Sequence, residues 1–159
     1  MTRKQSKERK ILRTKYPSRV GITASAFDVL HAGHVAMLTE AKFYCDELVC
    51  ALHIDPSIEN KKKSPVMQTV VERYIQLSAV KCVDEIIPYE TEADLCNLFN
   101  LRHFNVRIIG EEYFGKPFTG KDINLKNGTE IIYNKRRHDF SSTLKRMQIR
   151  KNIIDKTIV

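Results

Sequence analysis

Short apolar runs alternate with segments of helical periodicity along most of the chain. The runs predict strands over residues 19–26, 47–54, 85–88, 106–110 and 130–133. Between them, apolar residues recur at three- and four-residue spacing and predict helices over 33–45, 66–81 and 91–104, with a last helix over 141–153. Strands that alternate with helices of this length favour an open parallel sheet with right-handed crossovers. The expected architecture is a single Rossmann-like α/β domain, with five parallel strands and helices on both faces.

Local patterns add detail to these elements. Thr91 is followed three residues later by Asp94, a spacing typical of a capping box at a helix start. The glycine-containing stretch 115–128 is predicted as a loop. His53 and His103 stand within apolar segments and are predicted to be packed side chains. In the helix over 66–81, the residues predicted to share one face are Val70, Val71, Tyr74, Leu77 and Ser78.

The composition narrows the class of protein. With 159 residues, of which 42% are hydrophobic, the chain is long enough for one compact domain with its own core. Its apolar runs fall short of the roughly 20 residues that span a membrane, and its charged start lacks the apolar stretch of a signal peptide. The expected location is the cytoplasm. The four cysteines lack a C-x-x-C pair and are expected to be buried, reduced thiols.

The formal net charge of +8 is distributed unevenly. Residues 1–19 hold eight Lys or Arg against one Glu, and residues 135–159 hold eight against two Asp. The segment between them has 11 basic against 16 acidic residues. We therefore expect a basic, flexible extension over 1–18 and a folded domain over 19–159. A nucleic-acid-binding arm is the non-enzymatic alternative, but the extension lacks interleaved aromatic residues, so nucleic acid is disfavoured as a partner.

A pair of histidines follows the first predicted strand. His31 and His34 flank Gly33 at an expected helix start, and their three-residue spacing puts both rings on one side of the first turn. Gly33 permits close approach of the backbone, and the amides of a helix N-terminus attract anions. The stretch therefore predicts a phosphate-binding turn; the alternative is that the histidines only cap the helix. A metal site is not predicted here, because no cysteine or third histidine stands at ligand spacing.

A second polar cluster precedes the last predicted helix. Ser141, Ser142 and Thr143 stand at its start, where hydroxyls and backbone amides can bind a polyphosphate. The plain alternative is an ordinary N-cap. Other polar residues follow the remaining strands, among them Lys61 to Lys63 and the Glu111-Glu112 pair. Because the carboxyl ends of parallel strands share one edge of a sheet, we expect these groups to converge there.

Two signatures in the right order identify a family resemblance. Residues 27–34 resemble F-D-x-x-H-x-G-H, and residues 141–146 resemble S-S-T-x-x-R, both of the nucleotidyltransferase superfamily. Within that superfamily, residues 20–147 are similar to the cytidylyltransferases, and to the bacterial glycerol-3-phosphate cytidylyltransferase family in particular. Arg136 and the segment 110–116, G-E-E-Y-F-G-K, carry this closer likeness. The first signature is matched at Phe27, Asp28, His31, Gly33 and His34.

The resemblance implies an activity and a set of site residues. The expected reaction transfers CMP from CTP to a phosphorylated alcohol, glycerol 3-phosphate, giving CDP-glycerol and pyrophosphate, with Mg²⁺ accompanying the nucleotide in a homodimeric enzyme. The implied catalytic residues are His31, His34, Lys61, Lys63 and Arg136. The implied nucleotide-binding residues are Ala26, Phe27, Asp28, His31, Gly33, His34, Lys63, Glu112, Arg136, Ser141, Ser142 and Thr143.

Some positions depart from the family pattern. Ser25 and Ala26 stand where the family has Gly-Thr, and Asp139 adds a negative charge beside the second signature. Leu95 occupies the place of a lysine that the family associates with the acceptor phosphate. An adenylyltransferase, or a cytidylyltransferase for another phosphorylated alcohol or sugar, therefore remains the alternative.

Overall fold

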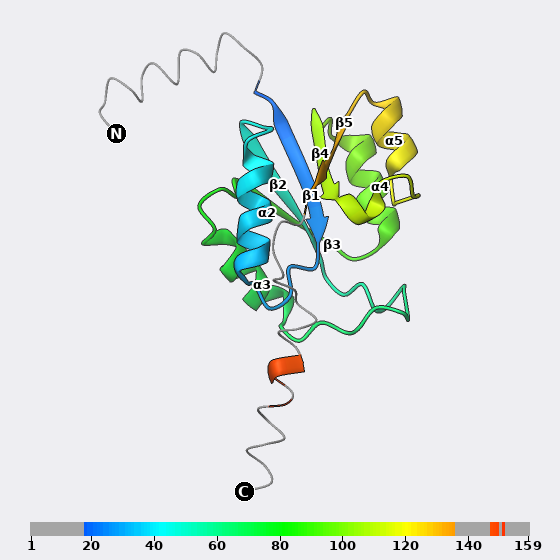
Figure 1. The fold of residues 1–159 in the computed structure, drawn as a ribbon. Coiled ribbons are helices and arrows are strands. Elements are labelled where there is room, and N and C mark those ends of the chain that lie inside the picture. Colours follow the sequence, from blue (N-terminus) through cyan, green and yellow to red (C-terminus); the bar gives the residue numbers. More distant parts are fainter. Residues whose placement is uncertain (1–17, 136–146, 150, 152–159) are drawn as a thin grey trace, which may run out of the picture.

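A computed structural model of the chain describes residues 18–135, 147–149 and 151. These residues contain one sheet of five parallel strands in the order β3-β2-β1-β4-β5 (Figure 1). The chain starts at the centre of the sheet, moves outward to β3, and then crosses back to β4. The point where the strand order reverses lies between β1 and β4, and ligands of open α/β sheets bind at such points. The strands are β1 (Val20–Ser25), β2 (Glu47–His53), β3 (Glu85–Tyr89), β4 (Val106–Gly110) and β5 (Glu130–Asn134).

Helices cover both faces of the sheet, which confirms the predicted α/β architecture. Helices α2 and α3 pack on one face, and α4 and α5 lie over the other (Figure 1). The 3-10 helix η1 and the six-residue α5 lie between β4 and β5, and α5 falls in the predicted loop because so short a helix has little periodicity. Residues 147–149 and 151 are helical, within the last predicted helix. The helices are α2 (Ala32–Lys42), α3 (Val70–Ser78), α4 (Glu92–Leu101), η1 (Glu111–Tyr113) and α5 (Lys121–Lys126).

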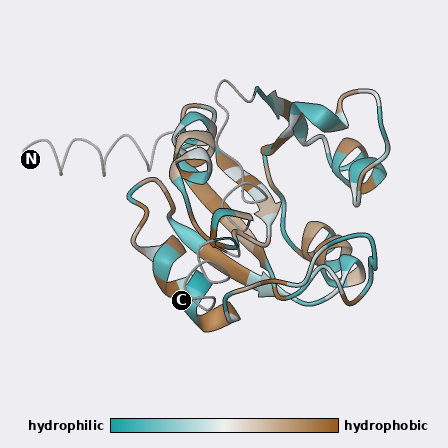
Figure 2. Cartoon of the chain, turned by 60° about the horizontal axis from the view of Figure 1, so that its bottom comes forward, coloured by the Kyte–Doolittle hydropathy of each residue, from teal (hydrophilic) through white to brown (hydrophobic). Residues whose placement is uncertain are grey.

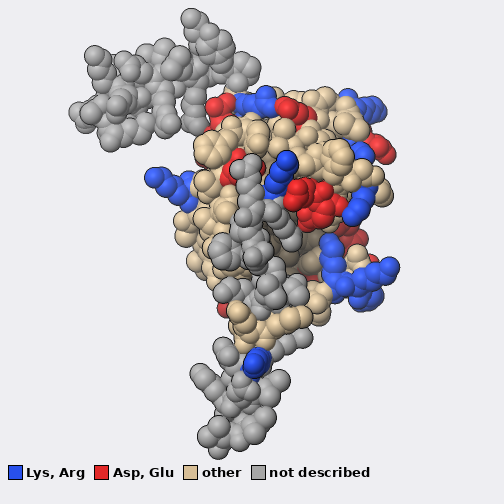
Figure 3. Space-filling view, in the orientation of Figure 1, with Lys and Arg blue, Asp and Glu red and all other residues tan. Residues whose placement is uncertain are grey.

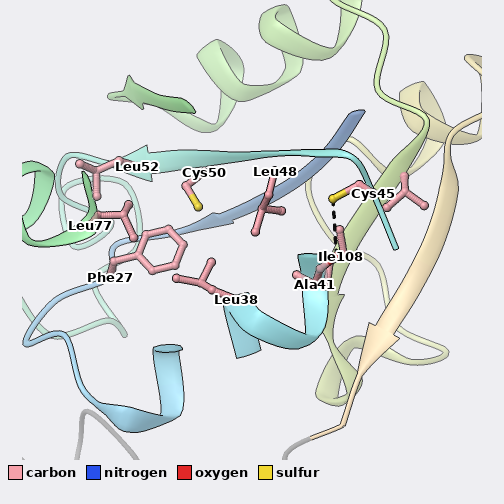
Figure 4. Packing of buried hydrophobic residues seen from close by; sticks show 10 residues of the cluster. Phe27, Leu38, Ala41, Cys45, Leu48, Cys50, Leu52, Leu77 and Ile108 are labelled. Carbon is pink, nitrogen blue, oxygen red and sulfur yellow. Dashed lines mark hydrogen bonds between the residues drawn. The ribbon is translucent and has the colours of Figure 1, made fainter. Parts of the chain in front are cut away.

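The core has two halves, one on each side of the sheet. Strand β2 is buried from its second to its last residue, so its side chains enter both halves alternately. Apolar residues follow the strands and the inner sides of the helices in Figure 2. On the α2 and α3 side, Phe27 packs with Leu38, Leu52 and Leu77 (Figure 4). Because Phe27 is the second residue after β1, this packing fixes the start of the turn that leads to α2.

The predicted face of α3 is only partly correct. Val70 and Leu77 pack against the core, but Val71 and Tyr74 are 62% and 42% exposed. The buried position between the two core residues is Arg73, which is 1% exposed. Residues 70, 73 and 77 are spaced i, i+3, i+7 and therefore lie on one face of the helix. Arg73 is buried on this face because of its position, although its polar side chain predicts exposure to solvent.

The predictions for the histidines and cysteines have mixed outcomes. His53 is buried, as predicted, whereas His103 is exposed and that prediction is wrong. All four cysteines are free; Cys45 and Cys50 are buried, and desolvation raises the pKa of both thiols. Within the described part of the chain, none of the helices has both the length and the apolar character needed to cross a bilayer.

Thr69 caps α3, and its loss should have a measurable cost. Its hydroxyl accepts a hydrogen bond from the Glu72 amide, and the Glu72 carboxylate accepts one from the Thr69 amide, forming a capping box. We expect Thr69→Ala to lower the free energy of unfolding by about 1 kcal/mol in urea titrations. Thr39→Ala is the matched control, because the Thr39 hydroxyl bonds a carbonyl in mid-helix, and it should be neutral within about 0.5 kcal/mol. Equal losses in both variants would contradict the role of the cap.

Candidate active site

The two histidines of the first motif lie together at the N-terminus of α2. Their ring centroids are 4.1 Å apart with a tilt of 32°. His31 is the N-cap residue, and its Nδ1 accepts a hydrogen bond of 3.0 Å from the Gly33 amide. Because Nδ1 accepts, the neutral ring carries its proton on Nε2. The capping role therefore fixes the tautomer in which His31 is an Nε2–H donor, so capping and donation to a phosphate are compatible.

Phe27 supports the pair from the core. Its ring centroid lies 5.8 Å from that of His34, at 59°, and its side chain is 1% exposed. His34 thus lies between a fixed aromatic ring and His31. Both histidines are half-buried, which places them at the surface of the domain on a rigid base.

The turn between β1 and α2 has a strained backbone. Phe27 and Val29 have φ angles of 48° and 51°, in the left-handed region that side chains with a Cβ seldom adopt. Such a conformation costs on the order of 1 kcal/mol per residue and persists only where the surroundings enforce it. The strain therefore indicates that the path of this turn is imposed by its contacts.

Asp28 supplies the contacts that enforce the turn. Its carboxylate is buried and accepts hydrogen bonds of 3.0 Å from the amides of both Met67 and Gln68. In return, the Gln68 side chain accepts a bond of 2.8 Å from the Val29 amide. Asp28, predicted from the signature to bind nucleotide, thus links the turn to the segment before α3.

Arg73 ties together the carboxyl ends of the central strands. Its Nη1 donates to the carbonyls of Ala26 and His53 at 2.7 Å each. Its other nitrogens donate to the carbonyls of Ile54 and Gln68. Burial lowers the pKa of Arg73, an effect that nearby Asp28 opposes. Arg73 was not among the predicted site residues, although an arginine on the apolar face of a predicted helix is a signal that could have identified it.

The predicted lysines lie on a loop anchored at both ends beside this turn. The loop follows β2, where Arg73 holds the carbonyl of Ile54, and it returns at Met67 and Gln68, which bond Asp28. Lys61 and Lys63 are exposed between these anchors. Figure 3 shows basic side chains gathered at the lower right, where Figure 1 draws this loop. The structure thus fixes the ends of the lysine loop beside the turn between β1 and α2 and leaves its cations facing solvent.

Asp55 shapes the beginning of the same loop. Its Oδ1 accepts bonds from the amide and the hydroxyl of Ser57, at 2.9 and 2.7 Å. These two bonds lower the pKa of Asp55. The resulting turn directs the chain away from the sheet edge immediately after β2.

Glu112 lies at the neighbouring strand end. Its carboxylate folds over Gly110, the last residue of β4, so closely that a Cβ added to Gly110 would lie 2.2 Å from the Glu112 carboxylate. Strand β4 adjoins β1, so Glu112 shares the sheet edge with the histidine turn. The predicted residues Arg136, Ser141, Ser142 and Thr143 lie outside the described residues.

A turn into a helix N-terminus at the switch point of a parallel sheet is typical of nucleotide-binding α/β domains. Residues 22–151 match the model of the family described as cytidylyltransferase-like. The chain belongs to this family, within the nucleotidyltransferase superfamily. The first of the two predicted signatures therefore forms the expected strand, turn and helix.

Curated relatives include proteins named bifunctional protein HldE. The protein of Caulobacter sp. (strain K31) is 31% identical over 116 residues, which are 72% of this chain and 23% of that protein. The protein of Nitrobacter winogradskyi is 32% identical over 126 residues, 79% of this chain and 26% of that protein. The chain thus spans about a quarter of the length of these relatives.

Solved structures share the fold. The lipopolysaccharide core biosynthesis protein from Thermoplasma volcanium has a TM-score of 0.63 at 23% identity, covering 76% of this chain and 99% of that one. Pantothenate synthetase from Thermus thermophilus has a TM-score of 0.54 at 16% identity, covering 79% and 59%. At these identities, the likeness extends to the fold alone.

Proposed function

We propose that this chain transfers a nucleotidyl group from a nucleoside triphosphate to a phosphorylated acceptor and releases pyrophosphate. The observation that carries the proposal is the close pair of His31 and His34 rings at the N-terminus of α2, with the tautomer of His31 fixed by its bond to Gly33. As the first candidates we take CTP as donor and glycerol 3-phosphate as acceptor, which would give CDP-glycerol.

The proposed chemistry is a direct displacement at phosphorus. An oxygen of the acceptor phosphate attacks the α-phosphorus in line, a new P–O bond forms, and the bond to the β-phosphate breaks. The electron pair of the broken bond leaves with pyrophosphate. The acceptor phosphate is already anionic at neutral pH, so the protein contributes mainly positioning and stabilisation of charge. Mg²⁺ enters with the nucleotide, as part of the substrate.

The described residues supply donors for this displacement. His31 and His34 would donate to oxygens that gain charge at the α-phosphate and the leaving group. Lys61 and Lys63 would close over the phosphates from their anchored loop. Glu112, at the end of β4, would contact the nucleotide from the other side of the switch point.

We place the remaining predicted contacts on the second signature. Arg136 and the cluster Ser141, Ser142 and Thr143 would hold the β- and γ-phosphates, as the family resemblance implies. Hydroxyls and amides at a helix start suit this part of the nucleotide.

A second candidate differs in donor base and acceptor. Leu95, which replaces the acceptor lysine of the family pattern, lies on the buried side of α4, is 2% exposed and packs in the core. That position therefore provides neither a cation nor a surface contact for glycerol phosphate. This observation counts against glycerol 3-phosphate, so the second candidate acceptor is another phosphorylated alcohol or a phosphorylated sugar, with either ATP or CTP as donor.

A substrate matrix tests both candidates. We expect pyrophosphate release with Mg²⁺ only when a nucleotide and an acceptor are both present, across CTP and ATP against glycerol 3-phosphate, phosphocholine, phosphoethanolamine and sugar phosphates. The nucleotide that responds identifies the donor base, and the acceptor that couples release to a new product identifies the substrate. Calorimetry that detects no binding of any Mg²⁺–nucleoside triphosphate, together with no release in the matrix, would overturn the proposal.

A further inference from the structure

Three Lewis bases converge beside β2, outside the residues assigned to the nucleotide. They come from separate segments: His53 ends β2, Glu59 lies in the lysine loop, and Glu92 is the first residue of α4. One ligand atom from each lies within 4.8 Å of the others. In addition, a Glu59 oxygen accepts a bond of 2.7 Å from the Glu92 amide, so the loop and the helix are already in contact.

The hydrogen bond of His53 determines which ring nitrogen faces this cluster. Nε2 lies 3.1 Å from the carbonyl oxygen of Glu90. Because a carbonyl only accepts, Nε2 carries the proton and Nδ1 of the neutral ring has a lone pair. Nδ1 lies 3.9 Å from a Glu92 carboxylate oxygen, beyond hydrogen-bond range, and within the described residues it has no hydrogen bond. The lone pair of a largely buried ring thus lies near a carboxylate.

The surroundings hold the ring in this orientation. His53 stacks on Tyr89, with ring centroids 4.5 Å apart, and its side chain is only 4% exposed. Burial lowers the pKa of His53, which favours the neutral ring, and Lys63 acts in the same direction, while Glu92 and Glu59 oppose it. Donation of one ring N–H to a backbone carbonyl, which leaves the other nitrogen available to a metal ion, is the usual arrangement of a metal-binding histidine.

We propose that His53, Glu59 and Glu92 form a site for a divalent transition-metal ion of the Zn²⁺ type. One imidazole and two carboxylates match the nitrogen and oxygen ligands that Zn²⁺ accepts, and three protein ligands leave a fourth position for water or another donor. Mg²⁺ is disfavoured because it prefers oxygen ligands throughout.

Ion binding requires only small movements. Ligands of a tetrahedral Zn²⁺ site lie ~3.4 Å apart, so the three atoms must approach by about 1 Å or somewhat more. The Glu59 side chain is exposed and that of Glu92 is 40% exposed, so both can rotate, while His53 stays fixed. A bound ion would join the lysine loop to α4 and thereby restrain Lys61 and Lys63 over the sheet edge.

Zn²⁺ binding to the full chain tests the site directly. We expect equilibrium dialysis to give one Zn²⁺ whose affinity falls about 10-fold or more in both Glu92→Gln and His53→Gln. Glu90→Gln is the matched control, since its side chain is exposed and lies outside the cluster. Unchanged Zn²⁺ affinity in Glu92→Gln, a surface variant expected to fold normally, would overturn the proposal even if His53→Gln failed to fold.

Trypsin cleavage tests the consequence for the loop. Trypsin cuts after lysine, so cleavage at 61–63, followed by mass spectrometry, reports how often the loop opens. We expect Zn²⁺ to slow cleavage there in the wild type and in Glu90→Gln, chelation to reverse the effect, and Glu92→Gln to show none. Slowing by Zn²⁺ that persists in Glu92→Gln would contradict the proposed link to α4. Both readouts are independent of nucleotide transfer, so either proposal can fail without the other.

Discussion

Replacing His34 with alanine should lower kcat about 10²- to 10³-fold in a pyrophosphate-release assay, the usual cost of losing one donor to transition-state charge. His34 is held between the rings of His31 and Phe27, so its position is set by the fold before substrate arrives. Because the interaction strengthens as charge develops, the loss should fall on kcat rather than on KM. Substitution by asparagine, which keeps an N–H donor, should retain more of the rate than alanine does.

The exposed histidine His103 provides the matched control for this prediction. It lies outside the turn at the end of β1, and His103→Ala should leave kcat and KM unchanged. Urea titrations of both variants would separate a catalytic effect from a loss of folded protein, since removing the ring beside Phe27 also removes packing. Turnover of His34→Ala within about threefold of the wild type would exclude the assigned role.

Replacing Arg73 with methionine should destabilise the fold by about 3–5 kcal/mol, the range for removing one partner from a buried charged network. The guanidinium donates to four carbonyls, those of Ala26, His53, Ile54 and Gln68, at the ends of β1 and β2 and before α3. Methionine fills similar space but provides no donors, so these buried oxygens lose their partners. The midpoint and slope of urea unfolding would measure the loss.

Two further variants sharpen the test of Arg73. Arg73→Lys keeps the charge but presents a single ammonium group, which cannot span four carbonyls, so we expect an intermediate loss. Arg102→Met removes an arginine from a partly exposed ion pair with Glu85 and should cost about 0–1 kcal/mol. A loss for Arg73→Met no larger than that for Arg102→Met would show that the carbonyl network is not important for stability.

Elements with strong periodicity could be predicted, and elements without it could not. The five strands lie within about one residue of the runs that predicted them, because both faces of the central strands are covered and select continuous apolar residues. The six residues of α5 form less than two helical turns, too few to show a stripe of apolar residues along one face. The exposed positions Val71 and Tyr74 were misplaced because the pattern of α3 contains more apolar residues than the sheet can cover.

In the candidate site, too, local features could be predicted from the sequence and long-range contacts could not. His31, Gly33 and His34 are adjacent in sequence, so a helix start was enough to predict that the two rings would lie together. The contacts of Asp28 with Met67 and Gln68 join residues about 40 positions apart, and no local pattern reports them. The second signature at 141–143 lies outside the described residues, so its meeting with the histidine pair stays a prediction.

The sequence by itself determined the α/β class, the position of the histidine turn and the family, because hydrophobic periodicity and short motifs are properties of neighbouring residues. Only the tertiary structure decided that Arg73 is buried, that Phe27 and Val29 adopt left-handed conformations, and that His53 faces Glu59 and Glu92. These features depend on backbone carbonyls and amides supplied by distant segments. Their partners become defined only when the strands align and bring those groups within hydrogen-bond range.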